Sequence, residues 1–371
     1  MSKPLIPMRV NRRTSLPQFR GGPTHRWLDS CQRLVTFFAL ISIIFGMTYL
    51  PSLYMRHLKP VAFVWPANQT RDAYEMILPN VSTNLVASLC TPTSSSGQSS
   101  AKSSAAPVLV VVICSAVRNF EARRAIRTTW AQKDLVPPGV RIVFLLGRGQ
   151  NFTGQNSVIR EAKEFGDIVQ ENFLDSYANL TIKSLMMLKW YTQNCDKVPY
   201  LLKTDDDMYI NLKNLHQILL ANQKPNLLLG NLICGAKPIR DPYNKWFAPE
   251  YLYDSEYYPN YLSGTAYVLS RSTAKIFLEA AGSVPLFHME DIYITGCLAR
   301  FVGIRPEDHR GFSYEKRAIL PCLYSQVISS HQVTPAEMKL VAAKLRRPLQ
   351  CRPLKPAQLR SFGTGKCKWK R

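Results

Sequence analysis

The sequence predicts an α/β domain built on an open, mostly parallel β-sheet, preceded by a single N-terminal membrane-spanning helix. Two observations carry this prediction. Apolar, β-branched runs such as residues 107–114 and 140–147 alternate with stretches of helical pattern through the middle of the chain. An uncharged apolar run at residues 34–54 lies close to the N-terminus.

The chain has 371 residues, of which 46% are hydrophobic and 11% aromatic, a composition typical of a folded protein. The formal net charge of +22 is uneven along the chain. Residues 1–33 carry seven basic residues and one acid, and residues 338–371 carry no acid. A nucleic-acid-binding protein would concentrate its positive charge on the folded body, with aromatic residues interleaved, so we expect no nucleic-acid partner.

The run at 34–54 has the length and composition of a transmembrane segment. At 1.5 Å per residue its 21 residues span a bilayer core. It starts too late and is too long for a cleaved signal peptide, and its abrupt basic flank argues against a buried core helix. Because the heavier basic load precedes it, residues 1–33 form a cytosolic tail and the rest of the chain is luminal.

Cysteines and glycosylation motifs agree with a luminal compartment. Eight cysteines follow the apolar run, which permits several disulfides but leaves their pairing open. Candidate N-glycosylation motifs begin at Asn68, Asn80, Asn151 and Asn179.

Three regions follow the signal-anchor segment. Residues 55–106 are rich in proline, serine and threonine and predict a flexible stem. Residues 107–351 form the folded domain. Residues 352–371 are a basic tail, for which the simplest interpretation is a disordered extension; attraction to anionic glycans or lipid headgroups is the weaker alternative.

Within the folded domain, strands and helices alternate without an internal repeat. The expected strands are 107–114, 140–147, 166–170, 200–210 and 226–231, and the expected helices are 122–132, 157–165, 179–195, 212–222 and 289–303. Residues 234–270 lack strong periodicity and predict a binding subdomain of loops and short strands.

The most informative site is Lys203-Thr204-Asp205-Asp206-Asp207, three adjacent carboxylates that directly follow an apolar strand. Alternation along a strand would point Asp205 and Asp207 one way and Asp206 the other. In open α/β sheets ligands bind beyond the carboxyl ends of strands. Carboxylate oxygens there suit Mg²⁺ or Mn²⁺, which bridge to a diphosphate. The alternative is an acidic turn in water.

Other candidate groups are weaker by themselves. Glu290 and Asp291 open the predicted helix 289–303, where acids either complement the helix dipole or accept a proton from an attacking hydroxyl. His331 is a lone histidine, which is more often structural than a metal ligand.

Basic groups also lie near the proposed site in sequence. Arg123 and Arg127 are four residues apart, on one face of a helix, where they either clamp a diphosphate or form a solvated basic face. Lys183 and Lys203 are further cations. The sequence has no Walker A, G-x-G-x-x-G or G-x-S-x-G motif and no paired C-x-x-C, which disfavours P-loop, serine esterase and zinc-module chemistry.

Seven segments, in order, resemble the inverting β-1,3-glycosyltransferase family, which includes β-1,3-galactosyltransferases and β-1,3-N-acetylglucosaminyltransferases. They are RRAIRTTW (123–130), FLLG (144–147), EAKEFGDIVQENFLDSYANLTIK (161–183), KTDDDMY (203–209), YYPNYLSGTAYVLS (257–270), EDIYITGC (290–297) and HQVTPAEM (331–338). Together they cover nearly all of residues 107–351. Each is only moderately specific, but seven in the family's order behind a membrane anchor are very specific.

The resemblance implies a GT-A-like fold, a UDP-sugar donor (UDP-galactose or UDP-N-acetylglucosamine) and a Mn²⁺ ion. It assigns site residues position by position: Asp207, Asp205 and His331 to the metal; Asp205 and Asp206 to the donor's ribose and sugar; Arg127, Lys183 and Gly264 to further donor contacts; Asp291, supported by Glu290, to the catalytic base; Trp246 and Tyr261 to an acceptor platform.

The implied activity is Mn²⁺-dependent transfer of galactose or N-acetylglucosamine to the 3-hydroxyl of an acceptor glycan on protein or lipid, with inversion. The implied location is the Golgi membrane, as a single-pass type II protein, and a homodimer is compatible with it. The alternative is an inactive family member that acts as a lectin-like or chaperone subunit. One departure is the segment EDIYITG, which has one residue more before its glycine than the commonest spacing.

Overall fold

The computed structural model of the protein describes residues 23–57, 65, 70–73, 85, 90, 106–149, 154–221, 223–355 and 367. The chain divides into two compact units, Met1–Lys59 and Pro60–Arg371. The candidate glycosylation positions Asn68, Asn80 and Asn151 lie outside the described residues.

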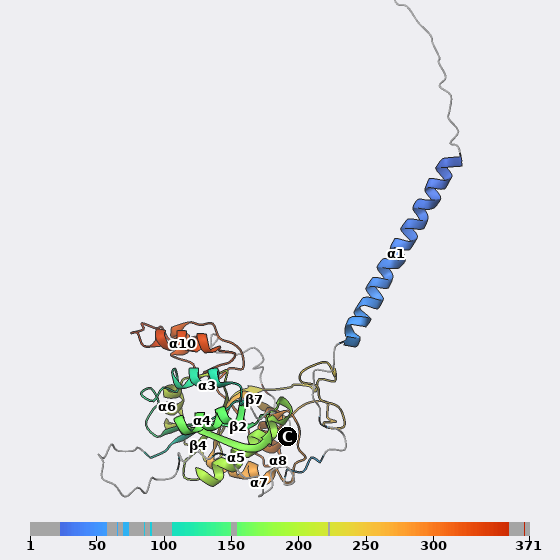
Figure 1. The fold of residues 1–371 in the computed structure, drawn as a ribbon. Helices are drawn as coiled ribbons and strands as arrows, with labels where there is room; N and C mark the ends of the chain where they lie inside the picture. The colour runs from blue at the N-terminus through green and yellow to red at the C-terminus, as the bar shows by residue number, and fades with distance from the viewer. Residues whose placement is uncertain are drawn as a thin grey trace, which may run out of the picture. The chain divides into compact units, whose positions relative to one another are not determined.

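The N-terminal unit contains one long helix, α1 (Pro23–His57) (Figure 1). Its segment Ser30–Leu50 is long and apolar enough to cross a membrane, and none of that window is buried against protein. Its apolar side chains, such as Phe38 and Ile44, are about 60% exposed, which suits a lipid rather than a water environment. The predicted apolar helix is therefore confirmed, with the span beginning a few residues before position 34.

The second unit is built on a seven-stranded sheet in the order β3-β2-β1-β4-β7-β6-β8. The strands are β1 (Leu109–Cys114), β2 (Val140–Arg148), β3 (Ile168–Leu174), β4 (Tyr200–Asp205), β6 (Leu228–Ile233), β7 (Tyr261–Ser270) and β8 (Glu307–Asp308). Only β7 runs antiparallel to its neighbours. The predicted α/β class with a mostly parallel sheet is confirmed.

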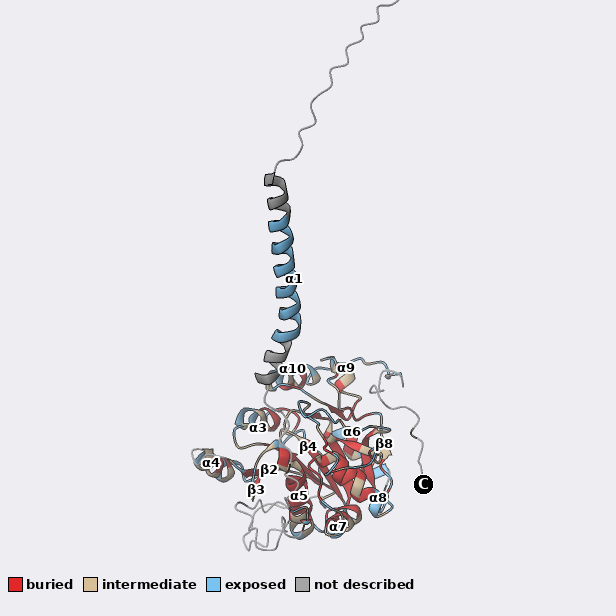
Figure 2. Cartoon of the chain, turned by 90° about the vertical axis from the view of Figure 1, so that its right-hand side faces the viewer, coloured by how far each residue is buried: buried red, intermediate tan, exposed pale blue. Residues whose placement is uncertain are grey.

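The sheet is buried on both faces, which explains why its strands are continuous apolar runs. Every residue of β1 is buried. Val110 and Val112 belong to one hydrophobic cluster, whereas Leu109, Val111 and Ile113 belong to the other. This two-residue alternation sends successive side chains into the two layers of core beneath the flanking helices. The strands of the sheet are accordingly coloured mostly as buried in Figure 2.

Helices cover both faces of the sheet. The cluster that contains Val110 includes residues of α5 (Leu180–Asn194) and α7 (Arg271–Ala280), which contact each other. The opposite cluster includes residues of α3 (Phe120–Arg127), α4 (Gln155–Phe165), α6 (Leu212–Ala221) and α10 (Pro335–Leu345). A capping box between Thr334 and Glu337 starts α10.

Two predicted elements differ from the structure. The expected strand 200–210 ends at Asp205 and resumes only at β5 (Tyr209–Ile210), which pairs with β9 (Ser329–Ser330). The expected helix 289–303 contains a π-helix, Ile292–Leu298, followed by one short turn, α8 (Ala299–Phe301). A π-helical turn accommodates one extra residue without shifting what flanks it.

The strand β7 was not predicted, because residues 234–270 were assigned to loops and short strands. Its sequence contains Ser263, Gly264 and Thr265 at a partly exposed point in the middle of ten residues. These small residues weaken the strand pattern, but the strand is held between β4 and β6 by antiparallel pairing.

The predicted stem does not behave as a free linker at its described residues. Trp65 is fully buried. The guanidinium of Arg71 donates to the carbonyls of Leu286 at 2.7 Å and Leu252 at 2.9 Å. Leu85 bridges to Gln170 of β3, and Cys90 forms a disulfide with Cys195. The serine- and threonine-rich run at 91–105 lies outside the described residues.

Disulfides also fix the C-terminal part of the chain. Cys322 pairs with Cys351, and Cys234 pairs with Cys367. The second bond joins the basic tail to the residue that follows β6, so the tail is not a free extension at Cys367. Among the described cysteines, Cys31, Cys114 and Cys297 are unpaired.

Trp65→Ala is expected to lower the free energy of unfolding by about 3–5 kcal/mol, because it empties a fully buried indole site. Denaturant unfolding followed by fluorescence measures it. Trp246→Ala is the matched control, since the Trp246 side chain is 52% exposed and its loss should cost much less. Equal stability of the two variants would show that the stem residues are not part of the folded unit.

Candidate active site

The candidate site lies at the carboxyl ends of β1 and β4. These strands are parallel neighbours whose register places Cys114 beside Asp205. The residues that follow each strand, Ser115 and Asp206, therefore meet at the same edge of the sheet. The partly exposed middle of β7 lies on the other side of β4, where Ala266 pairs with Thr204.

The three aspartates of the acidic triad take three different directions. Asp206 accepts hydrogen bonds from the Ser115 hydroxyl at 2.6 Å and the Asn119 amide at 2.9 Å. The Asp205 carboxylate pairs with the Lys203 ammonium at 2.7 Å. A carboxylate oxygen of Asp207 lies 3.3 Å from His331 Nε2. The expected alternation fails because β4 ends at Asp205 and the next two residues form a turn.

The surroundings of the three carboxylates also shift their pKa values differently. Burial raises the pKa of Asp205 to about 6, against the opposing charge of Lys203. Burial likewise raises the pKa of Asp206, although its two hydrogen bonds oppose this. For Asp207 burial is again the largest cause and acts in the same direction, but the hydrogen bond and charge of His331, a backbone hydrogen bond and the charge of Lys203 together lower the pKa.

Asp207 and His331 form the pair best suited to a divalent cation. His331 Nδ1 lies 2.7 Å from the Tyr314 carbonyl, so Nδ1 carries the proton and donates it there. Nε2 faces the Asp207 carboxylate, and although burial acts to lower the pKa of His331, their hydrogen bond raises it. Once Nε2 loses its proton, both side chains can bind a cation, and the Nδ1 contact with a carbonyl is the usual way that a protein orients a metal-binding histidine. One Asp205 oxygen bonds to Lys203, and the charge of Asp205 also acts on Asp207 and His331; its direct part in metal binding stays a prediction.

Two protein ligands are too few to hold an ion alone. In the part of the chain that the structure describes, no group of three or more His, Cys, Asp or Glu residues is arranged to hold a metal. Ions such as Mg²⁺ commonly take one or two carboxylates from the protein and their remaining ligands from substrate phosphates and water. The Asp207–His331 pair therefore fits an ion that binds together with a diphosphate.

Lys203 connects the triad to the second acidic pair. Its ammonium, 5% exposed, lies 3.6 Å from a Glu290 carboxylate oxygen as well as 2.7 Å from Asp205. It also donates a hydrogen bond to the Gly264 carbonyl. The other oxygen of Glu290 accepts from the Tyr267 hydroxyl at 2.6 Å and the Ser184 hydroxyl at 2.7 Å. Glu290 is buried and fully engaged, which suits a supporting carboxylate.

Asp291 is the carboxylate with room to react. Its two oxygens accept hydrogen bonds from the backbone amides of Gly264 at 3.2 Å and Ile292 at 2.9 Å, and the residue is partly exposed. Burial, followed by the charge of Glu290, raises the pKa of Asp291 to about 6. A carboxylate with a raised pKa is a better general base than an ordinary aspartate.

Gly264 lies directly against the acidic pair. A β-carbon at this position would lie 2.9 Å from a Glu290 oxygen and 3.1 Å from the Asp291 β-carbon. No side chain therefore fits without moving the two carboxylates.

Arg127 is positioned away from the triad. Its guanidinium forms two hydrogen bonds with Asp167, both at 2.8 Å, and one with Glu161 at 2.7 Å. Arg123 pairs with the same Glu161 at 2.6 Å and also donates to Ser115 at 3.0 Å. Both arginines form ion pairs that support this edge of the sheet, so they do not form a solvated basic face, and a donor contact by Arg127 stays a prediction.

Lys183 lies closer to the site. Its buried ammonium donates to the Ser115 carbonyl at 2.7 Å and pairs with Asp175 at 2.8 Å. It thus fixes the turn that presents Ser115 to Asp206. A direct donor contact by Lys183 stays a prediction.

The two expected acceptor residues lie on different elements. Tyr261 begins β7, and a β-carbon at Gly296, the glycine of the acidic segment, would lie 3.1 Å from the Tyr261 β-carbon. Trp246 lies in the loop after β6 with its side chain 52% exposed. The candidate glycosylation residue Asn179 precedes α5, and its side-chain amide donates to the Leu174 carbonyl at 2.9 Å.

Sequence reasoning missed several residues that complete the site: Ser115, Asn119, Ser184 and Tyr267. Ser115 and Asn119 follow a buried strand, so the rule that ligands bind beyond strand ends would have found them. Ser184 and Tyr267 are brought to Glu290 from separate elements, and nothing local to either residue signals it.

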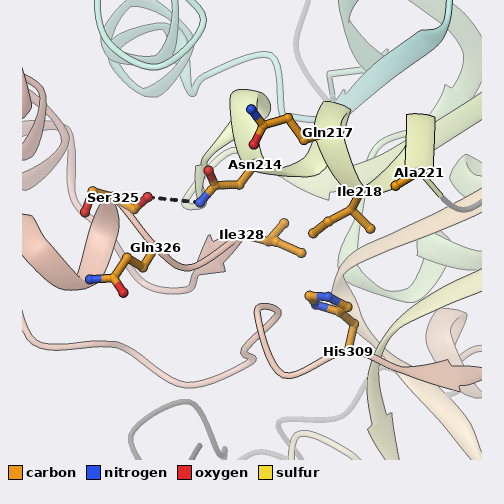
Figure 3. A pocket seen from close by; sticks show the side chains of 8 residues that line it. All are labelled: Asn214, Gln217, Ile218, Ala221, His309, Ser325, Gln326 and Ile328. Carbon is orange, nitrogen blue, oxygen red and sulfur yellow. Dashed lines mark hydrogen bonds between the residues drawn. The ribbon is translucent and has the colours of Figure 1, made fainter. Parts of the chain in front are cut away.

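A separate pocket of about 500 Å³ lies beside α6 and is lined by Asn214, Gln217, Ile218, Ala221, His309, Ser325, Gln326 and Ile328 (Figure 3). None of the acidic site residues lines it. The Asn214 amide donates to the Ser325 carbonyl at 3.0 Å, and the Gln326 amide to the Arg352 carbonyl at 3.0 Å. These amides hold the pocket's own walls together.

Comparison with known proteins identifies a family that matches the part of the chain containing the acidic triad and the Glu290–Asp291 pair. A family described as galactosyltransferase matches residues 121–310. The chain is 39% identical to β-1,3-galactosyltransferase 1 of Homo sapiens over 237 residues, which is 62% of this chain and 72% of that protein. It is 38% identical to human β-1,3-galactosyltransferase 2 over 241 residues, which is 62% of this chain and 57% of that protein.

Among solved structures, the galactosyltransferase LgtC, in complex with donor and acceptor sugar analogues, aligns with a TM-score of 0.31 at 12% identity. The alignment covers 65% of this chain and 98% of that one.

Proposed function

Because the chain belongs to the galactosyltransferase family, we propose that it transfers galactose from UDP-galactose to the 3-hydroxyl of an acceptor glycan, with inversion. That it is a glycosyltransferase enzyme follows from the family itself. The choice of galactose over N-acetylglucosamine is supported by the activity in the names of its relatives.

The observation that carries the proposal is the position of Asp291 relative to the triad. Lys203 links Asp205 at 2.7 Å to Glu290 at 3.6 Å, and Asp291 follows Glu290 directly. A carboxylate with a raised pKa and a set of diphosphate-binding groups thus share one edge of the sheet. Transfer of a sugar from a nucleotide requires both in one site.

In the proposed donor site, Asp206 accepts hydrogen bonds from the donor's ribose or sugar, and Gly264 allows the sugar to approach the backbone. Asp207 and His331 hold a Mn²⁺ ion. When bound, this ion would supply Lewis-acid stabilisation of the charge on the departing diphosphate. The Lys203 ammonium lies between the Asp205 and Glu290 carboxylates and offsets their negative charge.

The proposed reaction is a single displacement. The acceptor's 3-hydroxyl oxygen forms a bond to the anomeric carbon while the bond from that carbon to the phosphate oxygen breaks, and UDP leaves. Asp291 takes the hydroxyl proton in the same step. Attack from the face opposite the diphosphate converts the α-linked donor to a β-linked product.

We place the protein in the Golgi membrane, with the second unit in the lumen. The apolar helix α1 and the disulfides support this location. The sequence places the larger basic load before the helix, which favours a cytosolic N-terminus.

The test is a donor screen on the detergent-solubilised full chain. UDP-galactose, UDP-N-acetylglucosamine and UDP-N-acetylgalactosamine are each incubated with β-linked galactoside and N-acetylglucosaminide acceptors. We expect a β-1,3-linked galactose product, identified by its anomeric coupling in NMR. An α-linked product, or release of UDP that needs no acceptor, would contradict the proposal.

The pH dependence of transfer should report Asp291. Since a base works only when deprotonated, and the Asp291 pKa is raised to about 6, activity should fall below pH 6 and level off above it. Initial rates at saturating donor, from pH 4.5 to 8, measure this. An acid limb near pH 4, where an ordinary aspartate titrates, would show that Asp291 does not act as the base.

A further inference from the structure

Three exposed side chains lie at the rim of the site, and of these only Trp246 has so far been assigned a role, on the acceptor platform that the family resemblance implies. They are Tyr177, in the short helix η2 (Tyr177–Asn179), and Lys245 and Trp246, in the loop after β6. The side chains of Tyr177 and Trp246 are 53% and 52% exposed. Large exposed aromatic residues beside a reaction centre are characteristic of ligand-binding surfaces.

The three side chains contact one another across a long sequence separation. The Lys245 ammonium lies 4.9 Å from the centre of the Tyr177 ring and 5.5 Å from that of Trp246. The Trp246 indole acts on the Tyr177 hydroxyl as well, since it opposes the rise of the Tyr177 pKa. The loop after β6 is thereby joined to the segment that precedes α5.

Both of these segments form hydrogen bonds with the residues just before Glu290 and Asp291. The Thr181 hydroxyl, just beyond η2, donates to the Phe287 carbonyl at 2.7 Å. The Phe247 carbonyl, just beyond Trp246, lies 2.9 Å from His288 Nε2, which donates to it. Since Glu290 and Asp291 follow within a few residues, the three side chains are held beside the proposed base.

The pKa of Tyr177 also indicates that its side chain lies near Asp291. Burial, followed by the negative charge of Asp291, raises the pKa of Tyr177 to about 12, so its hydroxyl stays protonated at neutral pH. It can then donate and accept hydrogen bonds with a sugar.

Lys245 is a cation without an acidic partner. In the part of the chain the structure describes, no carboxylate lies within 4.0 Å of its ammonium. By contrast, Lys237 on the same loop also lies over an aromatic ring, 4.6 Å from the centre of Tyr257, but pairs with Glu256 at 2.9 Å. The cations nearer the reaction centre, Lys203 and Lys183, are buried and paired.

We propose that Tyr177, Lys245 and Trp246 form an acceptor subsite for a sugar that carries a negatively charged group, a carboxylate or a sulfate. The aromatic rings provide apolar surface for the C–H face of the sugar, and Lys245 pairs with the charged group. The subsite rests on the proposed function, because it presents an acceptor to Asp291.

The test compares matched pairs of acceptors that differ in the charge of the group at C6. A neutral β-galactoside is paired with its 6-O-sulfate, a neutral β-glucoside is paired with the corresponding β-glucuronide, and each is assayed with UDP-galactose and Mn²⁺. For the native chain, kcat/KM for a charged acceptor should exceed that for the neutral one by about three- to tenfold, mainly through KM and less so at high salt. In Lys245→Gln this ratio should fall to about one.

Lys237→Gln is the matched control, because it removes a neighbouring lysine that also contacts an aromatic ring, and it should keep the native ratio. A preference for only the sulfated or only the glucuronide acceptor identifies the anion. The subsite is wrong if the native enzyme does not distinguish charged from neutral acceptors, or if Lys237→Gln lowers the ratio as much as Lys245→Gln.

The aromatic part has its own test. Tyr177→Ala should raise KM for every acceptor, whereas Tyr177→Phe keeps the ring and should raise it less. UDP binding, measured separately, should be the same in all these variants. If the native chain did not bind UDP, the proposed function itself would be contradicted. Failure of the acceptor subsite would instead leave UDP binding intact, so the two outcomes can be told apart.

Discussion

Asp291→Asn should lower kcat by about two to four orders of magnitude, the usual contribution of a general base. The amide keeps the size of the side chain, and its single oxygen can still accept one of the two backbone hydrogen bonds that Asp291 receives from Gly264 and Ile292. It cannot take a proton from the acceptor hydroxyl. Affinity for UDP should change little, because Asp291 belongs to the acceptor side of the site.

Asp134→Asn is the control for this variant, since Asp134 is exposed and makes none of the contacts described at the site. It should keep native kcat. Steady-state rates with UDP-galactose and a neutral acceptor, together with UDP titration, separate the two effects. If Asp291→Asn kept more than about a tenth of native kcat, another group would have to be the base.

Asp207→Ala should lower the rate of transfer by at least about a hundredfold. A bound metal ion stabilises the charge that develops on the leaving diphosphate by several kcal/mol, and this variant should lose much of that stabilisation. The loss should appear as weaker UDP binding in the presence of Mn²⁺. His331→Ala should act in the same direction. Since the two residues are expected to act as one unit, the double variant should lose little more than the worse single one.

The double variant also gives the control. Were Asp207 and His331 structural and independent, their effects on transfer would multiply and their effects on unfolding would add. Asp254→Ala, in an exposed loop, should change neither UDP binding nor transfer. Native UDP binding in Asp207→Ala would show that this aspartate is not a metal ligand.

Much of the fold was predictable because the strands carry their own signal. The β-branched run that forms β1 is buried at every position, and a strand covered on both faces has no other pattern available to it. The strand β7 was not predictable, because the small residues Ser263, Gly264 and Thr265 interrupt its apolar pattern. Its place in the sheet depends on pairing with β4 and β6.

The site was predictable as a set of residue types but not as a set of contacts. The acidic triad was found from three adjacent charges after a strand, yet its geometry depends on the turn that begins at Asp206. Arg127 shows what helix spacing cannot predict. The spacing of Arg123 and Arg127 indicates that they share one face of a helix, but it does not indicate which residues pack against that face. Its partner Asp167 lies 40 residues away and precedes β3.

The most direct test of the account is a calorimetric titration of UDP into the solubilised full chain, with and without Mn²⁺. Binding should be strong only when the ion is present, and chelation should abolish it. If UDP binds equally well without any divalent ion, or does not bind at all, then Asp207 and His331 do not form a metal-dependent donor site.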